Sequence, residues 1–261
     1  MKHLLPLLAV LFLISCNKND DPVAHGPLLK SYTIFFQNQS GEFRPAEKIE
    51  YSYDLKGALI KTDQSQYDIE SKSFNLFSTS NFVYDHGRLV TIDKALIDYP
   101  QKSITRYEYF NGRVSRIVLD EEIDTEAKIG YLADNQVEIT YTSSNGRWFT
   151  YRFTTTNNNK EIERTFGEDL EIDSEIIHEY DNRKNPFSLL GYDDFFFENA
   201  SANNRIKTTS KYFGGSYPQS VPVSYEYQYN ELNYPTQKIT TYKSLGQSGA
   251  TSQLKTVFEY W

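Results

Sequence analysis

The chain has 261 residues, with 27 Lys or Arg against 35 Asp or Glu, so its formal net charge is −8. A nucleic-acid partner is not expected, because phosphate binding needs a concentrated basic surface and the sequence has no such Lys/Arg cluster. The single cysteine excludes an internal disulfide, a Cys-only zinc site and a CxxC redox motif. The 21 Tyr and 17 Phe residues favour strands, because aromatic side chains suit the half-buried surface of a sheet.

The first sixteen residues have the features of an export signal. Lys2 is followed by the apolar run Leu4–Ile14, which is too short for a spanning helix of about 20 residues. Leu13-Ile14-Ser15-Cys16 resembles the bacterial lipobox. The resemblance implies that residues 1–15 are cleaved off and that Cys16 carries lipid, including a fatty acid such as palmitate, which anchors the protein in a membrane. An ordinary signal peptide and a buried N-terminal helix are the alternatives.

Residues 16–30 are expected to form a flexible tether, because the segment after Cys16 is polar, contains Pro22 and lacks an apolar period. Lys18, Asp20 and Asp21 loosely resemble the acidic signal that follows the lipidated Cys in surface lipoproteins of Bacteroidota. We therefore expect an outer-membrane lipoprotein, on either the cell surface or the periplasmic face.

The body of the chain repeats a phrase in which Tyr-x-Tyr-Asp precedes a Gly and then alternating apolar residues. Aromatic residues two apart lie on one face of a strand, Asp or Asn starts a turn, and Gly supplies the positive φ that the turn requires. Each phrase therefore predicts a β-hairpin. The clear copies are residues 51–60, 82–90 and 107–114, and the weaker ones are residues 177–184 and 225–232.

The same alternation continues between and after these copies, which predicts twelve to sixteen strands in all. Residues 31–261 are expected to form a single all-β domain, a large antiparallel up-and-down meander that is curled or barrel-like. Two segments interrupt the pattern. Asp120–Lys128 is interpreted as an acidic connector, and the segment from Asn185 to Asn204 as an irregular loop with at most one short helix.

The phrase resembles the YD-type repeat, and the mature chain resembles a group of Bacteroidota lipoproteins whose domain of unknown function has a porin-like fold. The shared features are the lipobox, the hairpins, residues 180–187 (Tyr-Asp-Asn-Arg-Lys-Asn-Pro-Phe) and the later Asn203-Asn204. This resemblance implies a large antiparallel sheet and no established activity. A lipid-tethered, water-exposed domain is favoured over an outer-membrane barrel, because the alternating faces show no continuous apolar band.

No motif for catalysis, a metal or a cofactor stands out. His25 belongs to the tether, and Asp85-His86 could be half of a triad but has no GxSxG partner motif. The acidic residues 120–126 and the Asp193-Asp194 pair are interpreted as solvated or edge positions. Trp148, next to a predicted turn, is a weak candidate for a ligand contact, with a core or strand-edge role as the alternative.

These observations favour a lipid-anchored envelope protein with a non-enzymatic binding or structural role, and a glycan or a protein as its ligand. The alternative is an envelope hydrolase of polysaccharide or peptide, which predicts two carboxylates from separate strands within about 5–10 Å of each other. A purely mechanical or assembly role in the periplasm is a third reading. Clustering of exposed aromatic side chains in one concavity would favour recognition, and their dispersal would favour a scaffold.

Overall fold

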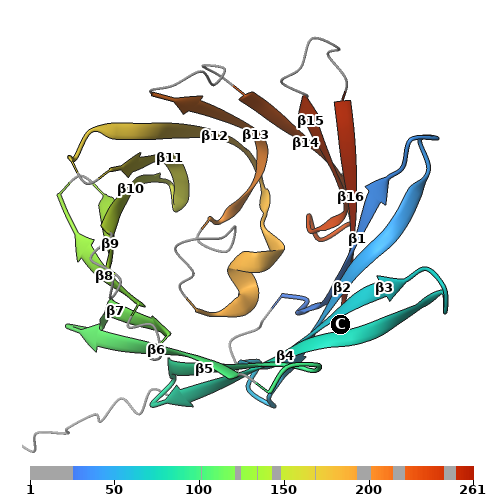
Figure 1. Ribbon diagram of the computed structural model, residues 1–261, viewed down its shortest axis with the longest axis horizontal. Coiled ribbons are helices and arrows are strands. Elements are labelled where there is room, and N and C mark those ends of the chain that lie inside the picture. The colour runs from blue at the N-terminus through green and yellow to red at the C-terminus, as the bar shows by residue number, and fades with distance from the viewer. Residues whose placement is uncertain are drawn as a thin grey trace, which may run out of the picture.

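A computed structural model describes residues 26–261, apart from residues 101, 121–124, 134, 143–147, 168, 193–200, 214–220 and 244–250. The chain forms a closed barrel of sixteen antiparallel strands in up-and-down order (Figure 1). The expected all-β antiparallel meander is confirmed, and the sheet closes between its first and last strands. In the described part of the chain, no helix is long and apolar enough to cross a membrane.

The strands follow the order of the sequence around the barrel. In the first half they are β1 (Leu29–Gln37), β2 (Phe43–Tyr53), β3 (Leu59–Asp68), β4 (Ser73–Asp85), β5 (Arg88–Leu96), β6 (Lys102–Phe110), β7 (Arg113–Asp120) and β8 (Thr125–Tyr131). In the second half they are β9 (Gln136–Thr142), β10 (Trp148–Thr156), β11 (Asn159–Phe166), β12 (Ile172–Lys184), β13 (Asn203–Tyr212), β14 (Val221–Tyr229), β15 (Pro235–Lys243) and β16 (Thr251–Tyr260).

Even-numbered strands end at one rim of the barrel, which we call the base, and odd-numbered strands end at the other, which we call the mouth. The chain enters the wall at the base, where Leu29 pairs with Tyr260. Leu28 accepts a backbone hydrogen bond from Trp261 there, at 3.0 Å. Both ends of the described chain therefore lie at the base.

The repeated phrases form the turns of the base. His86-Gly87 and Asn111-Gly112 adopt φ values of 47° and 75°, and 50° and 82°, the pair of positive φ angles of a type I′ hairpin. Asn157-Asn158 forms the same turn without glycine. The segment after β2 is a longer turn, in which the Asp54 carboxylate accepts the backbone N–H groups of Lys56 and Ala58 at 2.9 and 2.8 Å.

The turn after β14 repeats the turn after β2. The Asn230 side chain accepts the N–H groups of Leu232 and Tyr234, both at 3.0 Å, and Asn233 takes the positive-φ position that Gly57 takes after β2. This weaker copy of the phrase, at residues 225–232, is therefore a hairpin as predicted. Asn replaces Gly because its short side chain tolerates the left-handed region.

Two local predictions were wrong. Residues 177–184 do not form a hairpin: β12 runs through them to Lys184, where Arg183-Lys184 stands in place of a turn glycine. The Asp120–Lys128 segment is not only a connector, because β7 includes Asp120 and β8 begins at Thr125; residues 121–124 lie outside the described residues.

Strand pairing separates an inner face from an outer face. Tyr32 pairs with Phe258 and with Ile49, and its ring lies 5.5 Å from that of Phe187, which belongs to the segment inside the barrel. Residues in register with Tyr32 therefore point into the lumen, and their neighbours along each strand point outward, because side chains alternate between the two faces. Following the register around the sheet assigns a face to each regular strand position.

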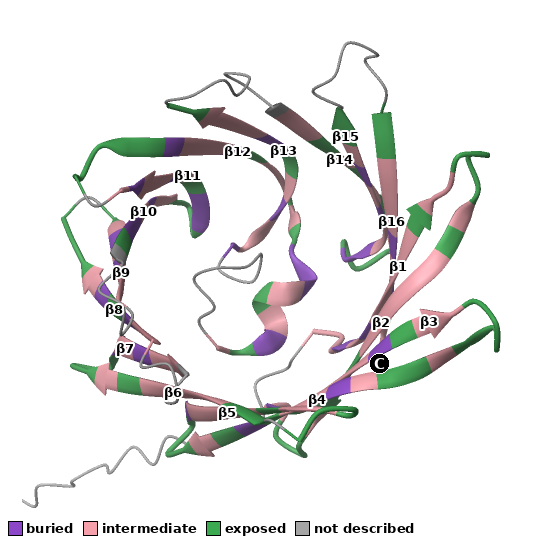
Figure 2. Ribbon diagram, in the orientation of Figure 1, coloured by how far each residue is buried: buried purple, intermediate pink, exposed green. Residues whose placement is uncertain are grey.

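Residues 185–192, which follow β12, enter the lumen from the base and fill part of it (Figure 1). This segment begins with the 3-10 helix η1 (Pro186–Leu190), which Asn185 caps by accepting the Phe187 N–H at 3.1 Å and which ends at Gly191 with φ 76°. Leu190 joins one of two apolar clusters on the inner face, and Figure 2 shows buried residues both along the wall and in η1. The other cluster lines β7–β10.

Asn185 fixes the start of this inserted segment by hydrogen bonds of its side chain. Its side chain is buried, and besides capping η1 it donates to the Ser201 carbonyl at 2.8 Å. We predict that Asn185→Ala lowers the free energy of unfolding by about 2 kcal/mol, because the Ser201 carbonyl loses its donor and η1 loses its cap. Urea denaturation measures this. Asn182→Ala, at an exposed site near the end of β12, should have little effect, and equal losses in the two variants would contradict the assignment.

Candidate functional site: the barrel interior

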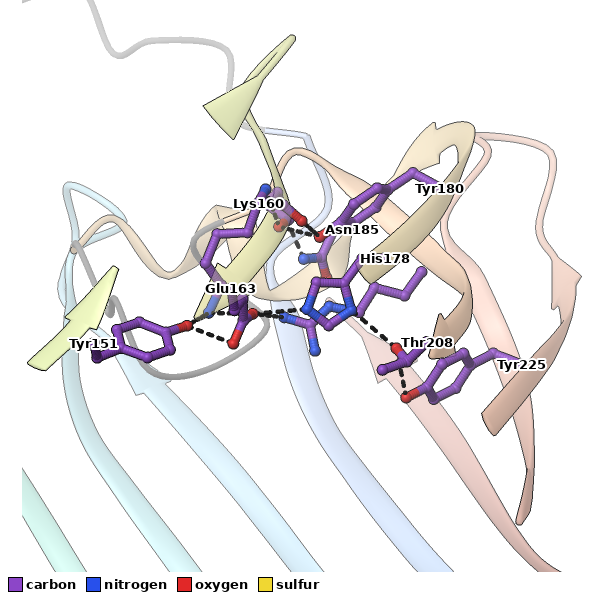
Figure 3. Close-up of polar contacts among 10 residues, drawn as sticks. Tyr151, Lys160, Glu163, His178, Tyr180, Asn185, Thr208 and Tyr225 are labelled. Carbon is purple, nitrogen blue, oxygen red and sulfur yellow. Dashed lines mark hydrogen bonds and ion pairs between the residues drawn. The ribbon is translucent and has the colours of Figure 1, made fainter. Parts of the chain in front are cut away.

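A buried polar cluster crosses five strands on the inner face (Figure 3). Glu163 on β11 accepts hydrogen bonds from Tyr151 on β10 at 2.5 Å and from His178 on β12 at 2.7 Å. The Lys160 ammonium lies 3.0 Å from the same carboxylate. Thr208 on β13 contacts the other ring nitrogen of His178 at 2.9 Å. The cluster therefore ties four neighbouring strands together by side chains, and Tyr225 on β14 extends it by donating to Thr208 at 3.3 Å.

The charges of this cluster follow from its geometry. Burial alone would raise the pKa of Glu163, but the hydrogen bond from His178 and the charge of Lys160 outweigh it, so that pKa lies well below its usual 4.5. Burial lowers the pKa of His178 below 6.5, against the opposing effect of Glu163. At neutral pH an ionised Glu163 is therefore an acceptor only. The geometry assigns a neutral His178 that donates from Nε2 and accepts from Thr208 at Nδ1.

The cluster is suited to holding the wall together and not to reacting with a substrate. Lys160 is 0 % exposed and His178 is 5 % exposed. Burial, followed by the Glu163 charge, raises the pKa of the Tyr151 hydroxyl far above 10, so it stays protonated as a donor. A buried carboxylate is tolerable only with such donors and a nearby cation.

The 180–187 motif and Asn203-Asn204 form a second polar cluster, beside the base. Asp181 accepts hydrogen bonds from the backbone N–H of Arg183 at 2.9 Å, from the backbone N–H of Asn204 at 3.2 Å and from the Tyr229 hydroxyl. Asn203 donates to the Arg183 carbonyl at 3.0 Å. These contacts hold the two ends of the inserted segment together, so the motif positions that segment in the lumen.

The lumen is more polar and more exposed near the mouth than near the base. The strand register places four aromatic side chains on the inner face in the mouth half of the barrel: Phe36 on β1, Phe149 on β10, Tyr212 on β13 and Tyr242 on β15. They are 55 %, 47 %, 45 % and 40 % exposed. Exposure at inward positions means that water enters the lumen from this end.

Polar side chains share the inner face with these aromatics. On β2, β3 and β4, Ser78 donates to Gln64 at 3.0 Å, and Gln64 donates to Glu47 at 3.0 Å. Further exposed inward positions on this side of the mouth are Arg44, Gln66, Asn75, Lys94 and Ser103. The mouth thus combines flat aromatic surfaces with amide, hydroxyl and cationic groups.

Ion pairs between adjacent strands mark the outer face. Arg116 on β7 lies 2.8 Å from Glu108 and 2.5 Å from Glu126, and Arg152 on β10 lies 2.5 Å from Glu138. Three more join adjacent strands, namely Arg164–Glu175, Lys211–Glu175 and Lys207–Glu179, and two lie within one strand, Lys61–Asp63 on β3 and Lys48–Glu50 on β2. Exposed pairs add little stability, but they place charge at mid-wall height over much of the barrel.

The residues singled out from the sequence have different outcomes. Cys16 and His25 lie outside the described residues, as does the Asp193-Asp194 pair. Trp148 begins β10 and pairs with Thr142, but its side chain lies outside the described part, so its role as a ligand contact stays a prediction. The Nδ1 atom of His86 lies 2.7 Å from the Asp85 carboxylate, and the His86 side chain is 93 % exposed, which fits a turn residue.

The buried cluster was missed at the level of sequence. His178 belongs to the weaker copy of the phrase at residues 177–184, and nothing in the residues around it indicates Glu163 or Lys160 as partners. Glu163 pairs with Phe153 on the inner face, a contact between strands that the polar residues around Glu163 in the sequence do not signal. In the described residues, no group of three or more His, Cys, Asp or Glu side chains could hold a metal ion.

At the regular strand positions of the described wall, the lumen offers no pair of carboxylates on neighbouring strands. Away from strand ends and bulges, the inward carboxylates there are Glu47 on β2 and Glu163 on β11, which lie on distant strands of the sixteen-stranded ring. Both are engaged by neighbouring donors. The two-carboxylate arrangement that a hydrolase would need is therefore not formed by these residues.

No family model matches the chain, and no curated protein matches it. Among solved structures, a porin-like protein from Bacteroides uniformis ATCC 8492 is 10 % identical with a TM-score of 0.47, covering 89 % of this chain and 98 % of its own. A protein of unknown function from Bacteroides fragilis NCTC 9343 is 13 % identical with a TM-score of 0.21, covering 48 % of this chain and 86 % of its own. These structural neighbours are thus Bacteroides proteins described as porin-like or of unknown function.

The buried histidine makes stability depend on pH. Because the folded-state pKa of His178 is lowered, the unfolded chain binds the proton more tightly, and stability falls as the pH drops below about 6.5. Glu163, whose folded pKa is also lowered, adds a further loss below about 4.5. We predict that His178→Gln flattens the fall in urea midpoint between pH 7.5 and pH 5.5, whereas His86→Gln does not. Parallel pH profiles for wild type and His178→Gln would contradict this.

Proposed function

We propose that the protein is a non-enzymatic, lipid-anchored envelope protein whose water-exposed barrel holds a hydrophilic ligand at its mouth. The observation that carries this proposal is the distribution of side chains between the two faces of the wall. Charged pairs occupy the outer face, and exposed aromatic and polar side chains occupy the inner face near the mouth. The lipid anchor rests on the lipobox-like sequence that ends at Cys16.

The outer face argues against a barrel that spans a bilayer. A spanning barrel presents an apolar band of about 25 Å to lipid, and Lys or Arg at its midplane costs about 2–4 kcal/mol each. Here Arg116, Arg152 and Arg164 point outward from the middle of their strands and are paired with carboxylates. An outer face of this kind is stable in water, and the membrane attachment is then left to the lipid on Cys16.

The mouth provides the chemistry for a flat, hydroxyl-rich ligand. Aromatic rings stack on the apolar faces of sugars, and amide, hydroxyl and cationic groups supply hydrogen bonds at their edges. Tyr212 and Tyr242 lie on the inner face of β13 and β15, and Phe36 follows on β1 beyond β16. We therefore propose an oligosaccharide as the ligand class, with the exposed aromatic arc from β13 to β1 as its platform.

The hydrolase alternative finds no support among the described wall residues, because Glu47 and Glu163 lie on distant strands. The hydrolase and the binding protein predict different fates for the glycan. A hydrolase would shorten an oligosaccharide on prolonged incubation, whereas a binding protein would return it intact. Chromatography of the released glycan separates the two.

We predict that replacing two of the exposed lumen aromatics weakens glycan binding. Tyr212→Ala with Tyr242→Ala should lower affinity about tenfold, since each ring contact contributes roughly 0.5–1.5 kcal/mol. A glycan array identifies the ligand, and titration calorimetry measures the change.

The matched control replaces two aromatic residues of the outer face, Tyr67→Ala with Phe110→Ala. Their loss removes a similar area of ring surface without touching the lumen, so affinity should stay at the wild-type value. Failure of the wild-type protein to bind any glycan, or an equal loss in both double variants, would overturn the proposed platform.

A further inference from the structure

A chain of hydrogen bonds on the inner face near the mouth orients one carboxylate. Ser78 on β4 is 2 % exposed and its hydroxyl lies 3.0 Å from the side-chain oxygen of Gln64 on β3. The side-chain nitrogen of Gln64 lies 3.0 Å from Glu47 on β2. Because a carboxylate only accepts hydrogen bonds, Gln64 presents its NH2 group to Glu47 and its oxygen to the Ser78 hydroxyl. The direction of the chain is therefore set, and the chain ends on Glu47.

Glu47 differs from Glu163, the other inward carboxylate at the regular positions of the wall. Two hydrogen-bond donors and the Lys160 ammonium, at 3.0 Å, surround the Glu163 carboxylate. Within the described part of the chain, the half-buried Glu47 has Gln64 as its one hydrogen-bond donor and forms no ion pair. A carboxylate has about four acceptor positions. Glu47 therefore keeps acceptor positions open toward the lumen, whereas those of Glu163 are taken by the protein itself.

The side chains around Glu47 suit a sugar ring. Glu47 pairs with Ile34 on β1 and with Gln66 on β3. Phe36 lies two residues beyond Ile34 toward the mouth, on the same face, and belongs to the proposed aromatic platform. An aromatic ring covers the apolar face of a sugar, and a carboxylate forms strong hydrogen bonds with hydroxyl groups at the sugar's edge. Phe36, Glu47 and Gln66 therefore form one end of the platform, at which hydroxyl groups can be bound.

The charges near Glu47 disfavour an anionic ligand at this position. Arg44, on the inner face of the same strand, lies 3.8 Å from Glu42 in the adjacent mouth turn, which offsets its charge. Lys94 is three strands away on β5, about 14 Å along the wall. The other charged residues of the described mouth turns are mainly acidic, namely Glu70, Asp98, Asp169 and Glu171 against Lys72. A carboxylate or sulfate group on a ligand would therefore be repelled beside Glu47.

We propose that Glu47 selects uncharged oligosaccharides, by accepting hydrogen bonds from the hydroxyl groups of a sugar that stacks on Phe36. Gln64 and Ser78 are positioning residues, which hold the Glu47 carboxylate in one orientation. This inference rests on the proposed oligosaccharide function. It adds to that function the class of sugar, because oligosaccharides of uronic acids and sulfated sugars are excluded by the charge of Glu47.

The test uses the whole mature chain, residues 16–261, made without lipid as Cys16→Ser. The probes are oligosaccharides of glucose, galactose and mannose, each beside the oligosaccharide of its uronic acid, and calorimetry measures affinity. The protein should bind the neutral member of a pair more tightly than the acidic one. Glu47→Gln should lower the neutral affinity about tenfold, because a hydrogen bond to a charged group is lost, and should reduce the preference over the uronic acid. Glu42→Gln, the same charge change in the mouth turn, should keep the neutral affinity.

A second pair of variants tests the positioning chain. Ser78→Ala should lower the neutral affinity about threefold, because Gln64 loses the hydroxyl that orients it. The preference over the uronic acid should remain, since Glu47 keeps its charge. Ser80→Ala, at the next inward serine of β4, should change neither, and circular dichroism checks that all variants are folded.

Two results would overturn the role of Glu47 and leave the oligosaccharide function standing: tighter or equal binding of the uronic acid oligosaccharide by the wild-type protein, or an unchanged neutral affinity in Glu47→Gln. Equal losses in Ser78→Ala and Ser80→Ala would contradict the positioning chain. Binding of no member of any pair would instead remove the oligosaccharide function, and this inference with it.

Discussion

Closure of the sheet between β1 and β16 is the constraint on which the other features depend. Once Tyr32 pairs with Phe258, every strand has two neighbours, and the alternation of side chains along each strand assigns each regular position to the lumen or to the outside. The two faces of the closed ring therefore have different surroundings. Charged pairs take the outer face, and aromatic, apolar and hydrogen-bonded polar groups take the inner face.

A ring of sixteen strands is too wide for wall side chains to fill, and this protein fills part of the space with its own chain. The inserted segment after β12 places η1 against Tyr32 and Phe258, near the base. On the opposite wall, the Glu163 cluster takes up the inner face of β10–β13 with buried, mutually satisfied polar groups. The lumen is thus occupied toward the base and accessible toward the mouth, which places the proposed ligand platform at the mouth.

Much of the local structure was predictable because it depends on neighbours in sequence. Tyr-Asp and Asn-Gly phrases specify hairpins through the backbone conformation of their turn residues alone. The hairpin predicted at residues 177–184 is not formed, because contacts with residues far away in the sequence decide the structure there. Asp181 is engaged by the distant Asn204 and Tyr229, and the chain continues as a strand where a local reading placed a turn.

The candidate site was not predictable in the same way, because its parts meet only through the barrel. Glu163, His178 and Thr208 come from three strands, and the mouth aromatics from β1, β10, β13 and β15. The Asn185 and Asn203-Asn204 motif was noticed as a pattern of residues, but its role in holding the inserted segment required the fold.

The most direct test of this account is whether the outer face is stable in water. Sedimentation velocity of the mature chain carrying Cys16→Ser, in buffer without detergent, measures this. The account predicts a single compact, folded species whose sedimentation is unchanged by adding a mild detergent. Aggregation in buffer that is reversed only by detergent micelles would show that the outer face requires lipid, and would contradict the assignment of charge and water to the outside of the barrel.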